Sequence, residues 1–233
     1  RNPALPGLEE TVFEYGAGGY ARVERVRKAL METTPSICAE RALLLTESYR
    51  KSEGEPFVLR KAKALKNILT NMSIYIEDDQ MIVGNQASRN RAAPIFPEYS
   101  FEWVIEELDS FNQRSGDVFA IDEEAKEKLR GIRSYWKRKT HQEEVYANMT
   151  DVNMAAQKQN VIHRGGISMS GDGHIIPNHE MVLSRGFSGI REEAREKLDD
   201  SSNTEEQQAF YQAVIIAMDA AITFITRFAD LAE

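Results

Sequence analysis

Apolar residues recur at helical spacing through most of this chain, and this periodicity is the feature that most limits the folds it can adopt. Such residues follow one another every three or four positions through residues 20–30, 38–49 and 58–69, which is typical of helices with one buried face. Thr34 before Pro35 has the pattern of an N-cap followed by proline at the first helical position. The first 70 residues are therefore predicted to form three helices, and the second is expected to begin at this pair.

Two short runs of β-favouring residues interrupt the helical pattern after residue 73. Ile74 and Ile76 form the first run and residues 81–83 the second, on either side of the acidic, turn-like residues 77–79. The helical pattern then returns in residues 101–108, 122–136, 142–157 and 179–198, and a last helix is expected from Thr204, where Gln207 completes a capping box. We therefore predict a mostly helical chain with a few short strands.

The charge balance and the cysteine content exclude several classes of protein. The 29 basic and 37 acidic residues give a net charge of -8, which disfavours nucleic acid and anionic membranes as partners. Cys38 is the only cysteine, so no disulfide can form within the chain and a reducing compartment is expected. No signal-peptide pattern opens the sequence, and the most apolar stretch, residues 213–225, contains Asp219 and is shorter than the roughly 20 residues of a membrane span. We predict a cytoplasmic chain in which this stretch is a buried helix.

Three glycines precede the first predicted helix and suggest two interpretations. Gly16, Gly18 and Gly19 could belong to a loop whose backbone amides bind phosphate at a helix start. Their spacing differs from both standard nucleotide-binding fingerprints, and no βαβ pattern follows. A flexible linker is the favoured interpretation.

Basic residues surround two aromatic residues at the end of the helix predicted for residues 122–136. The cluster consists of Arg130, Arg133, Lys137, Arg138 and Lys139, with Tyr135 and Trp136 between them. Cations and aromatic rings together are typical of platforms for single-stranded nucleic acid, but cations are also favourable at a helix C-terminus. Because the whole chain is acidic, a solvated helix end or an interdomain contact is favoured.

A glycine-rich segment between residues 160 and 177 carries the strongest candidate site. His163, Arg164, Asp172, His174 and His179 lie within 17 residues of one another. Histidine with aspartate can orient a hydroxyl group, and arginine can hold an anion. A metal site is disfavoured because the last two histidines are five residues apart, whereas a helix brings ligands together at a spacing of four. A structural glycine-rich turn with incidental histidines remains the alternative.

Several blocks in unbroken order resemble the N-terminal signatures of the glycyl radical enzymes related to pyruvate formate-lyase. The blocks are "PSICAERALLLTESYRKSEGEPFVLRKAKALKNIL", "IYIEDDQMIVGNQ", "RAAPIFPEYS", "YWKRKT" and "GDGHIIPNHEMVLSRGFSGI". On this resemblance, residues 20–233 are the N-terminal helical portion of a pyruvate formate-lyase-like domain, and residues 1–19 are a linker or an N-terminal extension. The resemblance implies a ten-stranded α/β barrel of two half-barrels, of which this chain is the first part.

The resemblance also implies which parts of the radical chemistry lie elsewhere. In the family, a glycyl radical near the C-terminus generates a thiyl radical on a cysteine at the barrel centre. Neither the loop with the radical glycine nor the loop with the catalytic cysteine is present in this sequence. Cys38 lies in a block unlike the catalytic-cysteine loop, so the chain alone is expected to be inactive. No bound cofactor is expected, because a separate activating enzyme with S-adenosylmethionine and an iron-sulfur cluster installs the radical. The full-length protein is expected to form a homodimer and to act in anaerobic metabolism.

The substrate contacts implied by the resemblance are His174, Asp172 and Arg164. In related diol dehydratases the histidine that closes the equivalent turn binds a substrate hydroxyl, and His174 occupies that place here. Arg164 departs from the neutral, tyrosine-rich sequence of the diol enzymes, and a guanidinium favours a carboxylate or sulfonate over a neutral diol. We therefore expect an anionic substrate and radical cleavage of the C–S bond of isethionate or a similar hydroxyalkylsulfonate. A glycerol or 1,2-propanediol dehydratase is the alternative within the family, and a non-catalytic helical interaction domain is the alternative from another class.

Overall fold

The computed structural model describes residues 17–162, 170 and 175–233. Helices make up most of this part of the chain, with two three-residue strands. The longer elements in chain order are α2 (Ala17–Glu32), β1 (Ser36–Cys38), α3 (Glu40–Lys51), α4 (Phe57–Asn71), β2 (Ala92–Pro94), α6 (Glu123–Trp136), α10 (His179–Leu198) and α11 (Glu205–Ala232). Four shorter helices are α5 (Glu102–Glu107), the 3-10 turn η1 (Phe111–Gln113), α7 (His141–Ala147) and α8 (Asp151–Lys158). The expectation of a mostly helical chain with a few short strands is confirmed.

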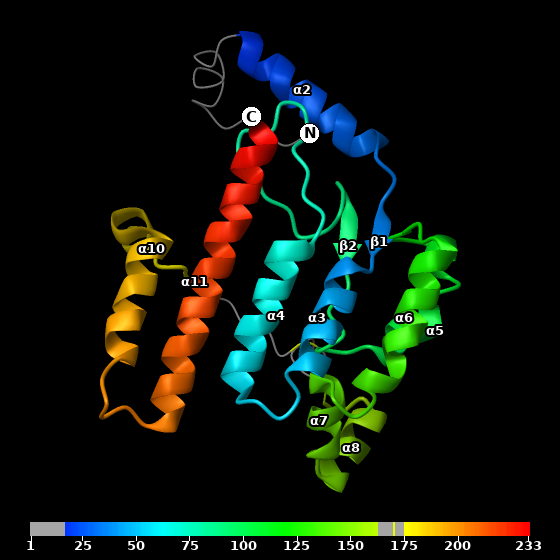
Figure 1. Ribbon diagram of the computed structural model, residues 1–233. Helices are drawn as coiled ribbons and strands as arrows, with labels where there is room; N and C mark the ends of the chain where they lie inside the picture. The colour runs from blue at the N-terminus through cyan, green and yellow to red at the C-terminus, as the bar shows by residue number, and fades with distance from the viewer. Residues whose placement is uncertain (1–16, 163–169, 171–174) are drawn as a thin grey trace, which may run out of the picture.

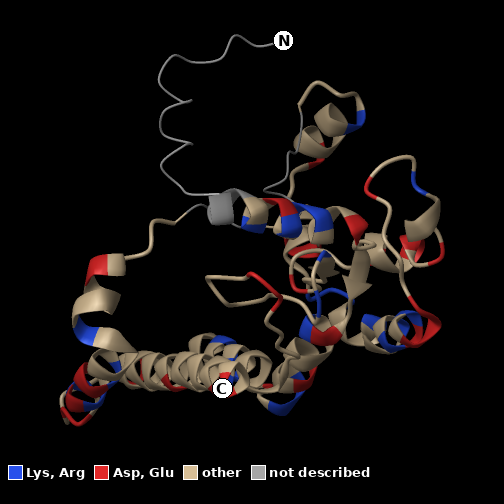
Figure 2. Ribbon diagram, turned by 90° about the horizontal axis from the view of Figure 1, so that it is seen from above, with Lys and Arg blue, Asp and Glu red and all other residues tan. Residues whose placement is uncertain are grey.

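Four long helices stand side by side as a row, in the order α10, α11, α4 and α3 (Figure 1). α6 contacts the far side of α3 (Figure 1). α2 lies beyond one end of the row in Figure 1 and is set off to one side of it when seen from above (Figure 2). A polar clamp joins α11 to α4, since the Arg227 guanidinium donates to the carbonyl oxygens of Leu69 at 2.7 Å and Met72 at 2.6 Å. A positive charge at these carbonyls also interacts favourably with the partly negative C-terminal end of the α4 helix dipole.

The core lies where α3, α5 and α6 meet. Its largest fully buried side chains are Trp136, Phe111, Leu108, Leu129 and Val104. The indole N–H of Trp136 donates to the Thr46 hydroxyl at 2.8 Å, so the one polar atom of this ring is satisfied inside the core. Each such side chain contributes about 1.5 to 3 kcal/mol when fully buried.

Side-chain caps fix the starts of several helices, as their sequence patterns predict. The Asp122 carboxylate accepts from the Ala125 amide at 2.7 Å at the start of α6. Thr204 and Gln207 form the predicted capping box of α11, with each side chain bonded to the other residue's amide. These caps satisfy amides that have no partner within their helix.

The predicted start of the second helix is wrong, because residues 36–38 form a strand instead. β1 pairs in parallel with β2, with Ser36 opposite Ala92, and α3 begins only at Glu40. The Ile37 amide donates to the carbonyl oxygen of Ala120 at 2.8 Å, on the other side of β1. Hydrogen bonds to two segments far away in the sequence therefore override the local N-cap pattern.

The two strands predicted around residues 74–83 are also wrong. This stretch contains no strand, and the described residues 73–91 form an irregular loop. The Asn85 side-chain amide donates to the carbonyl oxygens of Ser73 at 2.8 Å and Ala87 at 2.7 Å. Asp79 adopts a positive φ of 65°. Side-chain hydrogen bonds thus hold the loop in place of a strand ladder.

The helix predicted for residues 142–157 is divided into α7 and α8. α7 ends at Ala147, and the Thr150 hydroxyl accepts from the Asn153 amide at 3.3 Å to start α8. A new N-cap therefore interrupts one apolar pattern, because threonine competes for backbone hydrogen bonds near a helix end.

α11 begins where the sequence predicts, after the N-cap Thr204, but it is less buried than the sequence suggests. Within the part of the chain that the structure describes, it is the one helix long and apolar enough to cross a membrane, with a mean hydropathy of 1.6 and 17% of that window buried. A core helix of a soluble protein meets the same criterion. Ala213 and Ala220 are buried, whereas Phe210 and Ile225 are more than half exposed. The expectation of a buried helix therefore holds for one face only.

Candidate functional site

The three predicted substrate contacts lie outside the described residues. Arg164 and His163 fall in residues 163–169, and Asp172 and His174 fall in residues 171–174, two stretches that the structure does not describe. His179 is described, and it is the first residue of α10. What the structure provides is therefore the geometry at both ends of the glycine-rich segment, where α8 ends and α10 begins.

Asparagines occupy both of these ends. Asn160 follows α8 in the left-handed region, with φ of 57°, and the next amide, that of Val161, donates back to the Ala156 carbonyl at 2.9 Å. Asn178 precedes α10, and its side-chain oxygen accepts from the Met181 amide at 3.0 Å. Nothing in the apolar periodicity marks these residues. The signal in the sequence is an asparagine at each boundary of a glycine-rich stretch.

Exposed apolar side chains cluster on both sides of the same segment. Val161 and Ile162 precede it, and Ile175 and Ile176 follow it, with exposed fractions of 72%, 44%, 85% and 97%. Leu183 on α10 is 87% exposed. No other described part of the chain covers these apolar side chains.

The basic cluster at the end of α6 is occupied by contacts within the chain. Arg130 pairs with Asp109 at 2.7 Å, Lys139 pairs with Glu53 at 2.7 Å, and Arg133 pairs with Glu102. Trp136 is buried, so its face is not available for stacking on a base. Basic and acidic residues intermingle over the helices (Figure 2). These ion pairs join the end of α6 to other segments of the chain, which supports a structural role for the basic cluster and argues against a nucleic-acid platform.

The structure describes two of the three glycines near the start, and it places Cys38 in the interior. Gly18 and Gly19 lie in the first turn of α2, whereas Gly16 is outside the described residues. The Cys38 thiol is buried, and its sulfur accepts from the Ser88 amide at 3.4 Å. Among residues 17–162, 170 and 175–233, no group of three or more histidine, cysteine, aspartate or glutamate side chains is arranged to hold a metal ion.

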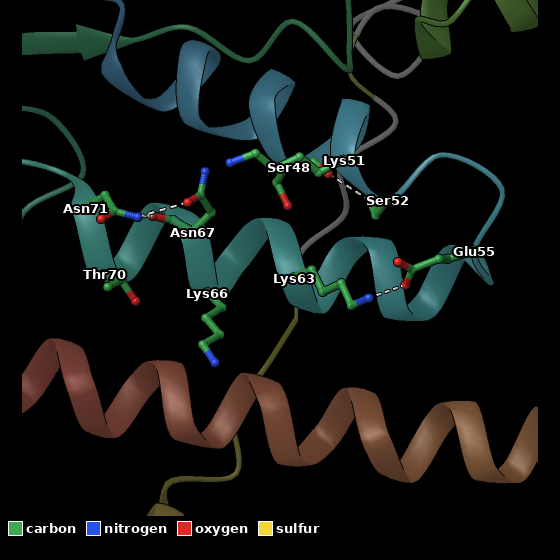
Figure 3. A pocket seen from close by; sticks show the side chains of 9 residues that line it. All are labelled: Ser48, Lys51, Ser52, Glu55, Lys63, Lys66, Asn67, Thr70 and Asn71. Atoms are coloured by element: carbon green, nitrogen blue, oxygen red, sulfur yellow. Dashed lines mark hydrogen bonds and ion pairs between the residues drawn. The ribbon is translucent and has the colours of Figure 1, made fainter.

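A polar groove of about 310 Å³ runs between α3 and α4 (Figure 3). Two of the lysines that line it have acidic neighbours, since Lys51 pairs with Glu47 at 2.5 Å and Lys63 pairs with Glu55. The Asn71 side-chain amide donates to the Asn67 carbonyl at 2.9 Å. These contacts occupy Lys51, Lys63 and Asn71 within the chain, whereas Lys66 forms no ion pair among the described residues.

A second groove, of about 580 Å³, lies between α2 and the loop of residues 75–82. Val26, Met81 and Ile82 contribute exposed apolar surface to its lining. At its edge the Arg25 guanidinium donates to the Asp79 carboxylate at 2.6 and 2.5 Å. These hydrogen bonds, and the positive charge of Arg25, lower the pKa of Asp79 below its ordinary value.

We expect Asp79→Asn to loosen α2 from the loop, because the substitution removes the charge that Arg25 binds. Since the pKa of Asp79 is lowered in the folded state, the contact contributes stability above the ordinary aspartate pKa of 3.8 and loses it as the pH falls through the lower folded value. Hydrogen exchange measured by mass spectrometry should become faster in peptides covering residues 22–32, and 1 M NaCl should have the same effect on the unmodified protein by screening. Glu32→Gln, at the other end of α2, is the control. Unchanged exchange in Asp79→Asn would show that other contacts hold α2.

Most of the chain matches known proteins in its sequence and in its fold. A family model described as "Pyruvate formate lyase-like" matches residues 13–233. The probable dehydratase YbiW of Escherichia coli is 36% identical over 217 residues, which cover 91% of this chain and 27% of that protein. The (2S)-3-sulfopropanediol dehydratase of Klebsiella oxytoca is 33% identical, covering 92% and 27%, and the isethionate sulfite-lyase of Oleidesulfovibrio alaskensis is 33% identical, covering 91% and 27%.

A solved structure carries the same fold. The glycerol-bound form of the B12-independent glycerol dehydratase from Clostridium butyricum matches with a TM-score of 0.84 and 38% identity, over 91% of this chain and 28% of that one. The chain belongs to the pyruvate formate-lyase-like family of glycyl radical enzymes. It spans a little over a quarter of the length of the relatives it matches. The expectation that its helices and short strands are a fragment of the glycyl radical enzyme fold is confirmed.

Proposed function

We propose that this chain is part of a glycyl radical lyase that cleaves the C–S bond of isethionate or a similar hydroxyalkylsulfonate and releases sulfite. The observation that carries the proposal is Arg164 in the glycine-rich segment of a chain 33% identical to an isethionate sulfite-lyase. A guanidinium presents a planar pair of donors that matches the oxygens of a sulfonate. A neutral diol would gain little from the same charge.

Each proposed contact has one task in this reaction. Arg164 holds the sulfonate, while His174, with Asp172, orients the hydroxyl group by hydrogen bonding. The thiyl radical supplied elsewhere in the full-length enzyme removes a hydrogen atom from the hydroxyl-bearing carbon. The hydroxyl group then loses its proton as the adjacent C–S bond breaks, so that sulfite leaves and the unpaired electron remains on the carbon that carried it. This aldehyde radical takes the hydrogen atom back from the thiol, which gives the aldehyde product and restores the thiyl radical. Fixing the two ends of a small substrate limits the motion of the reacting carbon, and such positioning accounts for much of the catalytic power of many enzymes.

The proposed partners of the full-length protein are an activating enzyme, a second copy of the chain and an anionic substrate. We propose that an activating enzyme with S-adenosylmethionine and an iron-sulfur cluster installs the radical, and that the enzyme works as a cytoplasmic homodimer. Its small-molecule substrate is an anion. Within this chain, whose net charge is -8, Arg164 would supply the local positive charge that an anionic substrate needs.

Dehydration is the alternative reaction, and the relatives support two forms of it. The glycerol dehydratase structure is 38% identical to this chain, which favours glycerol or 1,2-propanediol as the substrate. The sulfopropanediol dehydratase is 33% identical, which favours loss of water from a sulfonated diol. Arg164 fits the second form and has no evident role in the first.

The products of the activated full-length enzyme distinguish these reactions. After anaerobic activation and detection of the glycyl radical by EPR, the enzyme is given isethionate, (2S)-3-sulfopropanediol, glycerol and 1,2-propanediol in turn. Sulfite from isethionate supports the proposal. Aldehyde from the sulfonated diol without sulfite, or aldehyde from the neutral diols alone, would replace it with the corresponding dehydratase. A protein that accepts no radical would favour the non-catalytic interaction domain.

A further inference from the structure

The groove between α2 and the loop of residues 75–82 is lined by apolar side chains that the described chain leaves open to solvent. On the loop, Met81 is 78% exposed and Ile82 is 90% exposed. On α2, Val26 and Leu30 are also exposed. Because these four side chains share one groove, they form a gathered apolar surface, unlike single apolar residues scattered over a protein. Such a surface is typical of a place where another segment packs.

Two exposed carboxylates line the same groove. They belong to Glu77 and Asp78, and neither forms an ion pair with another described residue. The Glu77 carboxylate accepts from the Asn90 side-chain amide at 2.9 Å, and this neutral partner leaves the negative charge in place. Two negative charges beside an apolar surface favour a partner segment that carries lysine or arginine next to its apolar side chains.

The two walls of the groove are joined to each other by hydrogen bonds. The Arg25 guanidinium donates to the Asp79 carboxylate at 2.6 and 2.5 Å, and Nε of Arg22 donates to the Asp79 carbonyl oxygen at 2.7 Å. Within the loop, the Gln80 side-chain amide donates to the Ile82 carbonyl oxygen at 2.9 Å. Because these contacts need no added segment, a partner that enters the groove has less to order on binding.

The shape of the groove and the length of the relatives indicate what covers it. Small-molecule sites bury most of the surface of their ligand, whereas a wall that contains a side chain as exposed as Ile82 leaves a ligand open to water. This chain covers 27% of the dehydratase YbiW and 28% of the glycerol dehydratase chain, so most of the length of these relatives has no counterpart here. A segment of the same polypeptide binds at an effective concentration that can reach the order of millimolar, whereas a second copy pays the full cost of association.

We propose that the groove between α2 and residues 75–82 is a docking surface for a segment of the full-length chain that lies outside these 233 residues. Apolar side chains of that segment cover Met81 and Ile82, and a lysine or arginine of the segment pairs with Glu77 or Asp78. The surface thereby fixes α2 and the loop to the remainder of the enzyme. This inference does not depend on which substrate the enzyme accepts.

Photo-cross-linking in the full-length protein identifies the segment that covers the groove. The photoreactive residue p-benzoylphenylalanine replaces Met81, and equal amounts of copies labelled with nitrogen-14 and nitrogen-15 are mixed before irradiation. Mass spectrometry should find a cross-link to a peptide beyond residue 233, with both peptides carrying the same isotope. The same probe in place of Val118, which is exposed in a loop outside the groove's lining, is the control and should not capture that peptide.

Hydrogen exchange in the captured peptide measures what each wall contributes. Ile82→Ser should speed exchange there by about 10- to 150-fold, the change expected when a large apolar side chain is lost from a packed contact. Asp78→Asn should speed it by about 2- to 5-fold, as expected for an exposed ion pair. Val83→Ser is the matched control, because Val83 is an exposed neighbour of Ile82 outside the groove's lining. It should change exchange by no more than about 2-fold.

Several results would overturn the docking proposal. Cross-links between copies of different isotope would show that a second copy covers the groove, and cross-links confined to residues 1–233 would show that this chain covers it. The absence of any cross-link from Met81 would show that the groove stays open. Exchange that is equally fast in Ile82→Ser and Val83→Ser would remove the apolar wall from the contact. Neither measurement needs the radical or a substrate, so the outcome is separate from that of the sulfonate assignment.

Discussion

Trp136→Ala should destabilise the helical body by about 3 to 5 kcal/mol, the usual cost of truncating a buried aromatic residue to alanine. The Trp136 side chain is 2% exposed, and its ring lies 5.9 Å from Tyr49 and 5.3 Å from Tyr135, measured between ring centroids. Truncation would leave a cavity between α3 and α6 that rigid helices fill poorly. Urea unfolding of the full-length protein, followed by circular dichroism and by soluble yield, measures the loss.

Two variants separate the cavity from the hydrogen bond. Trp136→Phe loses the indole N–H, but the Thr46 hydroxyl still donates to the Ala42 carbonyl at 2.6 Å, so about 1 kcal/mol is expected. Trp103→Ala makes the same truncation at a partly buried ring, whose N–H bonds the Ser100 hydroxyl at 3.0 Å, and should cost about 1 to 2 kcal/mol. Losses in Trp136→Ala no greater than in Trp103→Ala would contradict a core centred on this residue.

Helices were predictable from this sequence wherever local signals agree with the packing. The capping box at Thr204 and the cap at Asp122 start helices in the structure as their patterns predict, because a cap needs only residues within three positions. The strand at Ser36 was not predictable in this way. Its partners, Arg91 and Ala120, are more than 50 residues away, and local propensity contains no information about such pairing.

The same distinction applies to the candidate site. The clustering of His163, Arg164, Asp172 and His174 is visible in the sequence, since all four lie in one short segment. The sequence shows Asn160 and Asn178 as asparagines at the boundaries of this glycine-rich stretch. The structure adds their capping roles, which depend on a positive φ at Asn160 and on a side-chain acceptor at Asn178. The basic cluster at the end of α6 shows a limit of reading composition alone. Its residues look like a surface for nucleic acid in the sequence, but Arg130 and Lys139 have acidic partners that lie 21 and 86 residues away.

Arg164→Ala should lower kcat/KM for isethionate by about 10- to 150-fold if the guanidinium holds the sulfonate. A charge-assisted contact of this kind is worth roughly 1.5 to 3 kcal/mol, and about 1.4 kcal/mol corresponds to each factor of ten. Because the contact exists before and during the reaction, most of the loss should appear in KM. The measurement is sulfite release by the activated full-length enzyme over a range of isethionate concentrations.

Arg164→Lys and His174→Ala are the comparisons that make this result specific. Lysine keeps the charge but loses the bidentate geometry, so Arg164→Lys should fall between the unmodified enzyme and Arg164→Ala. His174→Ala removes the proposed hydroxyl contact, so it should slow turnover of every hydroxylated substrate, whereas Arg164→Ala should spare any neutral diol that the enzyme accepts. EPR must find the same radical content in all variants, which ensures that the rates compare substrate handling. Equal losses for sulfonate and neutral diol in Arg164→Ala would show that this arginine supports the site as a whole and does not select an anion.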